Sequence, residues 1–277
     1  MNVTSAAHTG HRPGRVLRQP AVWMVVGIAG VGGVSVLSAS GSPVLAVVAA
    51  VAAFAVYWAV MRYVAGRDTP EIARTRAGRE ALLGVGLGVG FIAVSMLVVL
   101  TEFDFTRASG GVVATVLSIA AVQFGAAVIE ELIFRGLLLQ GLERLCGSWV
   151  ALAATAVLFG AIHLANPGAT WWTAFAIAVE AGVLMGAAFL WRRSLWTVMG
   201  LHFAWNTTEG LLGVPVSGHA SPGLLTAEPT GPDMLTGGQF GFEGSIVPVL
   251  VSLLLAVPML VVAHRRGRIV PVRRARR

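Results

Sequence analysis

The sequence predicts an all-α fold, a polytopic transmembrane helix bundle of about eight spans, on the basis of composition and pattern. Of the 277 residues, 56% are apolar and only 12% are charged, whereas an ordinary soluble domain carries about 25% charged residues. A surface with so few charges cannot be mainly hydrated, which excludes a water-soluble enzyme. Apolar stretches also recur at the length of about 20 residues that a helix needs to cross a bilayer core.

Eight such stretches follow one another along the chain. They are residues 21–39, 43–64, 81–101, 112–141, 149–165, 171–191, 195–212 and 245–264. The chain therefore divides into an N-terminal cytoplasmic tail of residues 1–20, a transmembrane bundle of residues 21–264 and a basic C-terminal tail of residues 265–277. Basic residues precede the first stretch as in a signal peptide, but seven further stretches favour an uncleaved anchor.

The arginines follow the positive-inside pattern of membrane proteins. All twenty basic residues are arginines, and in an eight-span chain eighteen of them lie in the tails and loops of one side. The other side has only Arg107, and Arg135 lies within the fourth span. This asymmetry predicts a bacterial cytoplasmic membrane protein with both termini in the cytoplasm. The net charge of +7 thus reflects topology, and no nucleic acid partner is expected because no aromatic-interleaved basic patch is present.

Small residues at helix-repeat spacing predict close packing between helices. Gly84 with Gly88, and Gly86 with Gly90, form two such pairs in the third span, and glycine lets helices approach closely in lipid. Residues 213–244 are rich in Gly, Pro, Ser and Thr and lack periodicity. They predict an outer loop, for which disorder is favoured over a lid.

The fourth span contains three ionisable residues within six positions. Each costs about 2.5–3.5 kcal/mol at bilayer depth, so such residues indicate a functional site. Arg135 follows Glu131 by one helical turn, which predicts an ion pair. Glu130 points roughly 140° away from Arg135 around the helix, and we expect it to face a cavity together with Gln123. A purely structural ion pair would account for Glu131 and Arg135 but not for Glu130.

Two histidines and an asparagine lie at a similar depth in other spans. His163 belongs to the fifth span, and His202 and Asn206 lie one turn apart in the seventh. At a rise of 1.5 Å per residue, Glu130, His163 and Asn206 each lie roughly 18–21 Å from the cytoplasmic ends of their helices. We therefore expect these side chains to share one site.

The residue types that the spans lack exclude other intramembrane hydrolases. All three aspartates, Asp68, Asp104 and Asp233, lie in loops, which excludes a protease with two catalytic aspartates. The sequence contains neither H-E-x-x-H nor G-x-S-x-G. Neither a helical zinc motif nor a serine nucleophile of that kind is therefore indicated.

Three motifs carry a resemblance to a known family. They are Glu130-Glu131-x-x-x-Arg135, Phe159-x-x-x-His163 and His202-x-x-x-Asn206. In this order the chain resembles the CAAX-protease and bacteriocin-processing (CPBP) family of intramembrane proteases, over about residues 80–264. The resemblance implies an endopeptidase that cuts a membrane-associated peptide or protein. Its implied catalytic residues are Glu130, Glu131, His163, His202 and Asn206, with Arg135 and Phe159 as structural support.

These residue types are compatible with two mechanisms. In the favoured one, Glu130 assisted by His163 activates a water as general base, and His202 and Asn206 stabilise the oxyanion. In the other, Glu130, His163 and His202 hold a divalent metal such as zinc. Activity that is lost on chelation and restored by zinc would favour the metal. The topology predicts a cavity open to the cytoplasmic half.

Two functions of another class compete with proteolysis. A proton-coupled transporter also places carboxylates and histidines within spans, and Glu180 in the sixth span fits that function. However, the sequence shows no inverted repeat. A non-catalytic membrane scaffold or immunity protein is the other alternative. For the protease, we expect the partners to be the lipid bilayer and a peptide or membrane-tethered protein substrate, whether prenylated or not.

Overall fold

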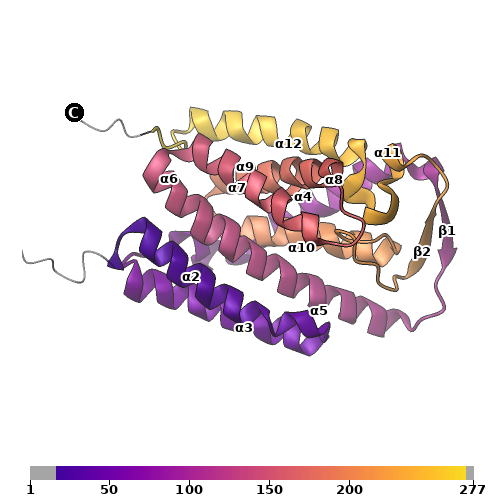
Figure 1. Cartoon of the computed structure of the whole chain (residues 1–277), viewed down its shortest axis with the longest axis horizontal. Coiled ribbons are helices and arrows are strands. Elements are labelled where there is room, and N and C mark those ends of the chain that lie inside the picture. The colour runs from indigo at the N-terminus through magenta and orange to yellow at the C-terminus, as the bar shows by residue number, and fades with distance from the viewer. Residues whose placement is uncertain (1–16, 273–277) are drawn as a thin grey trace, which may run out of the picture.

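The computed structural model describes residues 17–272, which form an all-α helix bundle (Figure 1). Residues 1–16 of the predicted N-terminal tail and residues 273–277 of the predicted C-terminal tail lie outside the described residues. Among the described residues, the helix α2 begins at Pro20 and the last helix, α12, ends at Arg265.

The bundle consists of long helices, some of them extended or joined by π-helical segments. The α-helices are α2 (Pro20–Ser35), α3 (Pro43–Ala59), α4 (Ala77–Val98), α5 (Val112–Glu131), α6 (Gln140–Cys146), α7 (Ser148–Ile162), α8 (Trp171–Ile177), α9 (Met185–Arg192), α10 (Leu195–Leu212), α11 (Asp233–Thr236) and α12 (Ile246–Arg265). The π-helical segments are η2 (Val60–Val64), η6 (Leu132–Leu139) and η8 (Ala178–Leu184). Shorter 3-10 turns are η1 (Ser38–Ser40), η3 (Pro70–Ile72), η4 (Arg74–Arg76), η5 (Leu100–Glu102), η7 (His163–Ala165), η9 (Gly238–Phe240) and η10 (Phe242–Gly244).

Seven of the described helices are long and apolar enough to cross a membrane. Each corresponds to a predicted span, and the bounds differ by at most five residues except at the start of the third, where the helical stretch begins at Pro70 and not at residue 81. The remaining predicted span, the seventh, at residues 195–212, is a helix with the predicted bounds, but it does not belong to this apolar set. Helix α10 is less apolar than the other seven because it carries the polar residues His202, Asn206 and Glu209. All three side chains are buried. In Figure 1, α10 lies in the interior, where it packs against α4, α5 and α9.

Glycines bring the backbones of α4 and α10 into contact. A Cβ atom at Gly84 would lie 2.1 Å from a backbone oxygen of α10, and one at Gly88 would lie 2.4 Å from another. The prediction of close packing is therefore confirmed for this pair. It is wrong for Gly86 and Gly90, which would meet nothing within 4 Å, because they lie on a face of α4 that has no neighbour.

We expect Gly88→Ala to lower the free energy of unfolding by about 1–3 kcal/mol, the usual cost of an overpacked contact. Gly90→Ala is the matched control on the same helix. It is expected to be neutral or to stabilise the protein by up to about 1 kcal/mol, because alanine favours a helix. Unfolding in detergent micelles measures both variants. Equal effects would contradict the view that Gly88 is needed for close packing.

Most of the described arginines gather at one end of the bundle, at the left of Figure 1, called here the arginine-rich end. Arg192 lies 2.6 Å from Glu80, and Arg193 lies 2.6 Å from Glu143. Arg193 also donates to the carbonyl oxygen of Arg268. These contacts join the start of α4, the end of α6, the turn after α9 and the chain after α12, as the predicted alternation of loops requires.

The opposite, arginine-poor end is covered by residues 213–244, at the right of Figure 1. Strand β2 (Leu225–Pro229) pairs antiparallel with β1 (Phe103–Arg107), with Phe103 opposite Pro229. Helix α11 and the turns η9 and η10 follow before α12 begins. The expectation that this loop is disordered is wrong, because strand pairing and short turns supply its backbone with hydrogen bonds.

Candidate active site

A cavity of about 640 Å³ lies between α5, α7 and α10. The lining residues that are exposed, and so form its mouth, include Gly41 of the segment between α2 and α3, and His219 and Ser221 of the loop 213–244. Both segments belong to the arginine-poor end (Figure 1).

The expectation that the cavity opens toward the arginine-rich half is therefore wrong. The physical reason is that the bundle is filled on that side of the site. Leu132, Leu139 and Leu184 are fully buried there. They belong to the same hydrophobic core cluster as Leu201 and Trp205, which flank His202 on α10.

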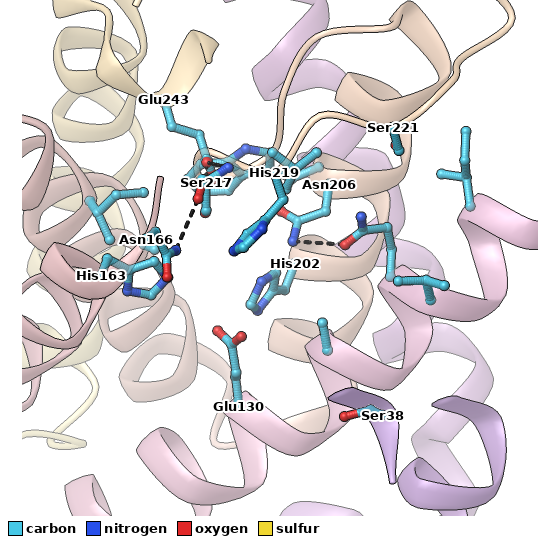
Figure 2. Close-up of a pocket in the computed structure, with 18 of the residues that line it drawn as sticks. Ser38, Glu130, His163, Asn166, His202, Asn206, Ser217, His219, Ser221 and Glu243 are labelled. Carbon is cyan, nitrogen blue, oxygen red and sulfur yellow. Dashed lines mark hydrogen bonds between the residues drawn. The ribbon is translucent and has the colours of Figure 1, made fainter. Parts of the chain in front are cut away.

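The four polar residues predicted to share a site line this one cavity. They are Glu130 of α5, His163 of η7, and His202 and Asn206 of α10. Figure 2 shows the carboxylate of Glu130 pointing into the space between the imidazoles of His163 and His202. Three helices thus deliver a carboxylate, two imidazoles and an amide to one enclosed space.

The ring of His163 is fixed from two sides. Its Nδ1 lies 2.7 Å from the carbonyl oxygen of Phe159, and because a carbonyl only accepts, Nδ1 carries the proton and donates it. In the neutral ring, Nε2 is then an acceptor. The ring of Phe159 stacks on the imidazole with centroids 4.7 Å apart, and Phe134 packs against Phe159 at the same separation.

Glu131 lies behind the cavity and does not line it. Its side chain is fully buried, and its Oε1 accepts a hydrogen bond of 2.9 Å from Nη1 of Arg135, which confirms the predicted ion pair. The same Oε1 lies 2.9 Å from Nδ1 of His202. Glu131 therefore contacts the cavity-lining His202 without lining the cavity itself, and its predicted catalytic role stays a prediction.

Arg135 is held by two π-helical segments. It belongs to η6, and its guanidinium also donates to the carbonyl oxygens of Ala181 and Gly182 in η8. A π-helical turn is wider than an α-helical one and occurs often at functional sites. The guanidinium carbon lies 5.0 Å from the ring centroid of Phe159, so Arg135 supports both Glu131 and the aromatic residue beneath His163.

Gln123 orients the amide of Asn206. Its Oε1 accepts a hydrogen bond of 3.2 Å from Nδ2 of Asn206, and both side chains line the cavity. This confirms that Gln123 faces the same cavity as Glu130. Since one amide hydrogen of Asn206 is used by Gln123, the other is available inside the cavity.

Sequence reasoning missed the loop residues that line the cavity. Glu243 is buried and accepts hydrogen bonds from both the backbone N–H and the hydroxyl of Ser217. Asn166 donates to the carbonyl oxygen of Ser217 over 2.9 Å. Burial raises the pKa of Glu243, while the hydrogen bonds from Ser217 act in the opposite direction. A loop without periodicity gives no signal that would place these side chains.

Glu180, the residue that favoured a transporter, does not line the cavity. Its side chain is fully buried, and neither carboxylate oxygen has a hydrogen-bond partner within residues 17–272. Glu180 therefore lies behind the cavity wall, close enough to the cavity-lining Glu243 for the two carboxyl groups to interact electrostatically.

The arrangement also bears on the zinc alternative. Within the part of the chain that the structure describes, no three His, Cys, Asp or Glu side chains are placed to hold one metal ion. Glu130, His163 and His202 share the cavity, but as arranged they do not form such a group. The metal alternative is not supported by this geometry and stays a prediction.

An apolar bundle with a polar cavity at its centre defines a membrane protein with a site inside its spans. Residues 112–208 match the model of a family described as type II CAAX prenyl endopeptidase Rce1-like. All three motifs fall within this range, and the match confirms the predicted resemblance. The match covers 97 of the 277 residues and shows similarity to this family over that range, and the seven apolar helices indicate an integral membrane protein. No curated protein and no solved structure gives a significant match to the chain.

Proposed function

We propose that the protein is an endopeptidase that hydrolyses a peptide bond of a membrane-associated peptide or protein. The observation that supports this most directly is the single cavity lined by Glu130, His163, His202 and Asn206. The cavity lies among apolar helices, where polar groups interact strongly because water is scarce. The mechanism below assigns a role to each of the four side chains.

Glu130 acts as the general base. A water held between its carboxylate and Nε2 of His163 loses a proton to Glu130 as its oxygen attacks the carbonyl carbon of the scissile bond. Glu130 then returns this proton to the nitrogen of the leaving amine as the C–N bond breaks. His163 orients the water, since the hydrogen bond from Nδ1 to Phe159 leaves Nε2 as an acceptor.

His202 and Asn206 stabilise the oxyanion of the tetrahedral intermediate. With Nδ1 hydrogen-bonded to Glu131, His202 can donate from Nε2 only as the imidazolium, a form that the negative charge of Glu131 favours. Asn206 donates its second amide hydrogen. Donors of this kind are each worth about 10²- to 10³-fold in rate.

A peptide library tests the proposed function. Purified protein in detergent is incubated with the library, and products are identified by mass spectrometry. We expect cleavage at defined bonds by the wild type and by Glu228→Gln, a matched control on the exposed face of β2. His163→Ala is expected to lose about 10²- to 10⁴-fold in rate, the range for a group that assists proton transfer.

Other outcomes of this experiment are equally informative. Absence of cleavage by folded wild-type protein would favour a transporter or a scaffold. We expect a chelator to leave cleavage unchanged. Loss of activity on chelation that only zinc restores would instead support a metal held by residues of this cavity.

We further propose that the protein lies in a bacterial cytoplasmic membrane with its arginine-rich end in the cytoplasm. The mouth of the cavity then faces the opposite side, so substrate would enter from outside the cytoplasm.

Labelling of cysteines tests this orientation. Ser221→Cys, made in a Cys146→Ser background, places an exposed thiol at the mouth. We expect a membrane-impermeant maleimide to label it in intact cells. Cys146 of the wild type, at the arginine-rich end, should react only after permeabilisation. The reverse pattern would show the opposite orientation.

A further inference from the structure

The turn Val216–His219 lies at the mouth of the cavity in a tightly defined conformation. The backbones of Val216 and His219 exchange two hydrogen bonds, of 3.1 and 2.9 Å. Both residues between them are left-handed, with φ of 48° at Ser217 and 84° at Gly218. This is the pattern of a two-residue reverse turn. The left-handed conformation is unfavourable for a serine, so Ser217 keeps it only because the surrounding residues impose it.

Four contacts impose that conformation. Glu243 accepts from the N–H and the hydroxyl of Ser217, and Asn166 donates to its carbonyl oxygen. The N–H of Gly218 donates to the carbonyl oxygen of Phe240 over 2.7 Å. A Cβ atom at Gly218 would lie 2.1 Å from a backbone oxygen of the segment before α8, so only glycine fits there. The turn is clamped between the chain before α8 and the chain before α12.

The clamped turn directs His219 into the cavity. Figure 2 shows its imidazole extending from the turn toward His202. His219 is exposed and lines the cavity, and its ring makes no hydrogen bond to another residue among those described. Unlike the rings of His163 and His202, it is held only by its backbone.

A peptide bound in this cavity would need hydrogen-bond donors along its main chain. Buried carbonyl oxygens without partners are costly, and the chain that leads from the scissile bond to the mouth must pass the clamped turn. An imidazole N–H is a suitable donor for such an oxygen.

We propose that His219 is a substrate-binding residue whose ring N–H donates to a main-chain carbonyl oxygen of the peptide, on the mouth side of the scissile bond. Ser217, Glu243 and Asn166 act as positioning residues that hold His219 over the cavity. This inference rests on the proposed endopeptidase function, which it deepens by assigning a binding contact.

Steady-state kinetics test it, with the fluorogenic form of the peptide that the wild type cleaves fastest in the library. His219→Ala is expected to raise KM about three- to tenfold, the value of one hydrogen bond, with kcat nearly unchanged. His219→Gln, which keeps an N–H donor, should recover part of this loss. His264→Ala, at the exposed arginine-rich end of α12, is the matched control and should leave both constants unchanged.

The positioning role is tested by Glu243→Ala, which is expected to raise KM as His219→Ala does. The double variant should be no worse than His219→Ala alone, because both changes remove the same contact. An unchanged KM in His219→Ala, or additive effects in the double variant, would overturn this inference while the proposed function stands. If Glu130→Gln cleaves the peptide as the wild type does, or the wild type cleaves nothing, both are overturned.

Discussion

Glu130→Gln is expected to lower the rate of peptide cleavage about 10³-fold or more, at the upper part of the range for general acid–base catalysis. Glutamine has the shape of glutamate but cannot take a proton from water at neutral pH. The side chain is only half-buried and points into the cavity, so the substitution should leave the fold intact. Initial rates and thermal unfolding of the same preparation measure the two effects separately.

The comparison with Glu228→Gln makes this prediction specific. Glu228 is exposed on β2 at the arginine-poor end, so the same chemical change there is expected to leave activity as in the wild type. Cleavage that survives in both Glu130→Gln and His163→Ala would contradict the mechanism, since no other carboxylate and imidazole pair is proposed to activate water.

Arg135→Leu is expected to lower the free energy of unfolding by about 3–5 kcal/mol, the usual cost of removing one partner of a buried ion pair. Arg135 and Glu131 are almost inaccessible to solvent, with side-chain exposures of 2% and 0%. The substitution leaves the Glu131 carboxylate buried with only His202 as its partner. Equilibrium unfolding in detergent measures the change.

Two further variants distinguish the ion pair from a general loss of charge. Arg62→Leu, at an exposed position, is expected to change stability by less than about 0.5 kcal/mol. Glu131→Leu combined with Arg135→Leu removes both charges and should recover much of the lost stability. A double variant that is as unstable as Arg135→Leu would show that the guanidinium contacts to Ala181 and Gly182 matter more than the pair itself.

The helices and the residues of the cavity could be predicted because both depend on regular spacing. Apolar stretches of fixed length set the spans, and the rise per residue sets the depth of Glu130, His163 and Asn206 within them. The face of a helix is less certain, as the two glycine pairs illustrate: Gly88 meets α10 and Gly90 meets nothing. Which face meets a neighbour depends on the tertiary arrangement, which a single sequence does not give.

Other features had no sequence pattern to reveal them. The turn that carries His219 depends on Glu243, more than 20 residues later in the chain, and on Asn166, about 50 residues earlier. The direction in which the cavity opens depends on how side chains fill the bundle, which topology alone does not determine. The hydrogen bonds that join Arg135 of η6 to Ala181 and Gly182 of η8 likewise have no signal in the sequence, since either segment has the composition of an ordinary helix.

The contacts of Arg135 also constrain how the chain is assembled in the membrane. Synthesis from the N-terminus delivers η6 first, with Glu131 and Arg135 already paired one turn apart. The carbonyl oxygens of Ala181 and Gly182, which complete the hydrogen bonds of the guanidinium, belong to a helix made later. Until that helix is inserted, the fourth span has a charged group with unmet donors. The hydrogen bonds of the fourth span are therefore completed only when the sixth span has been inserted beside it.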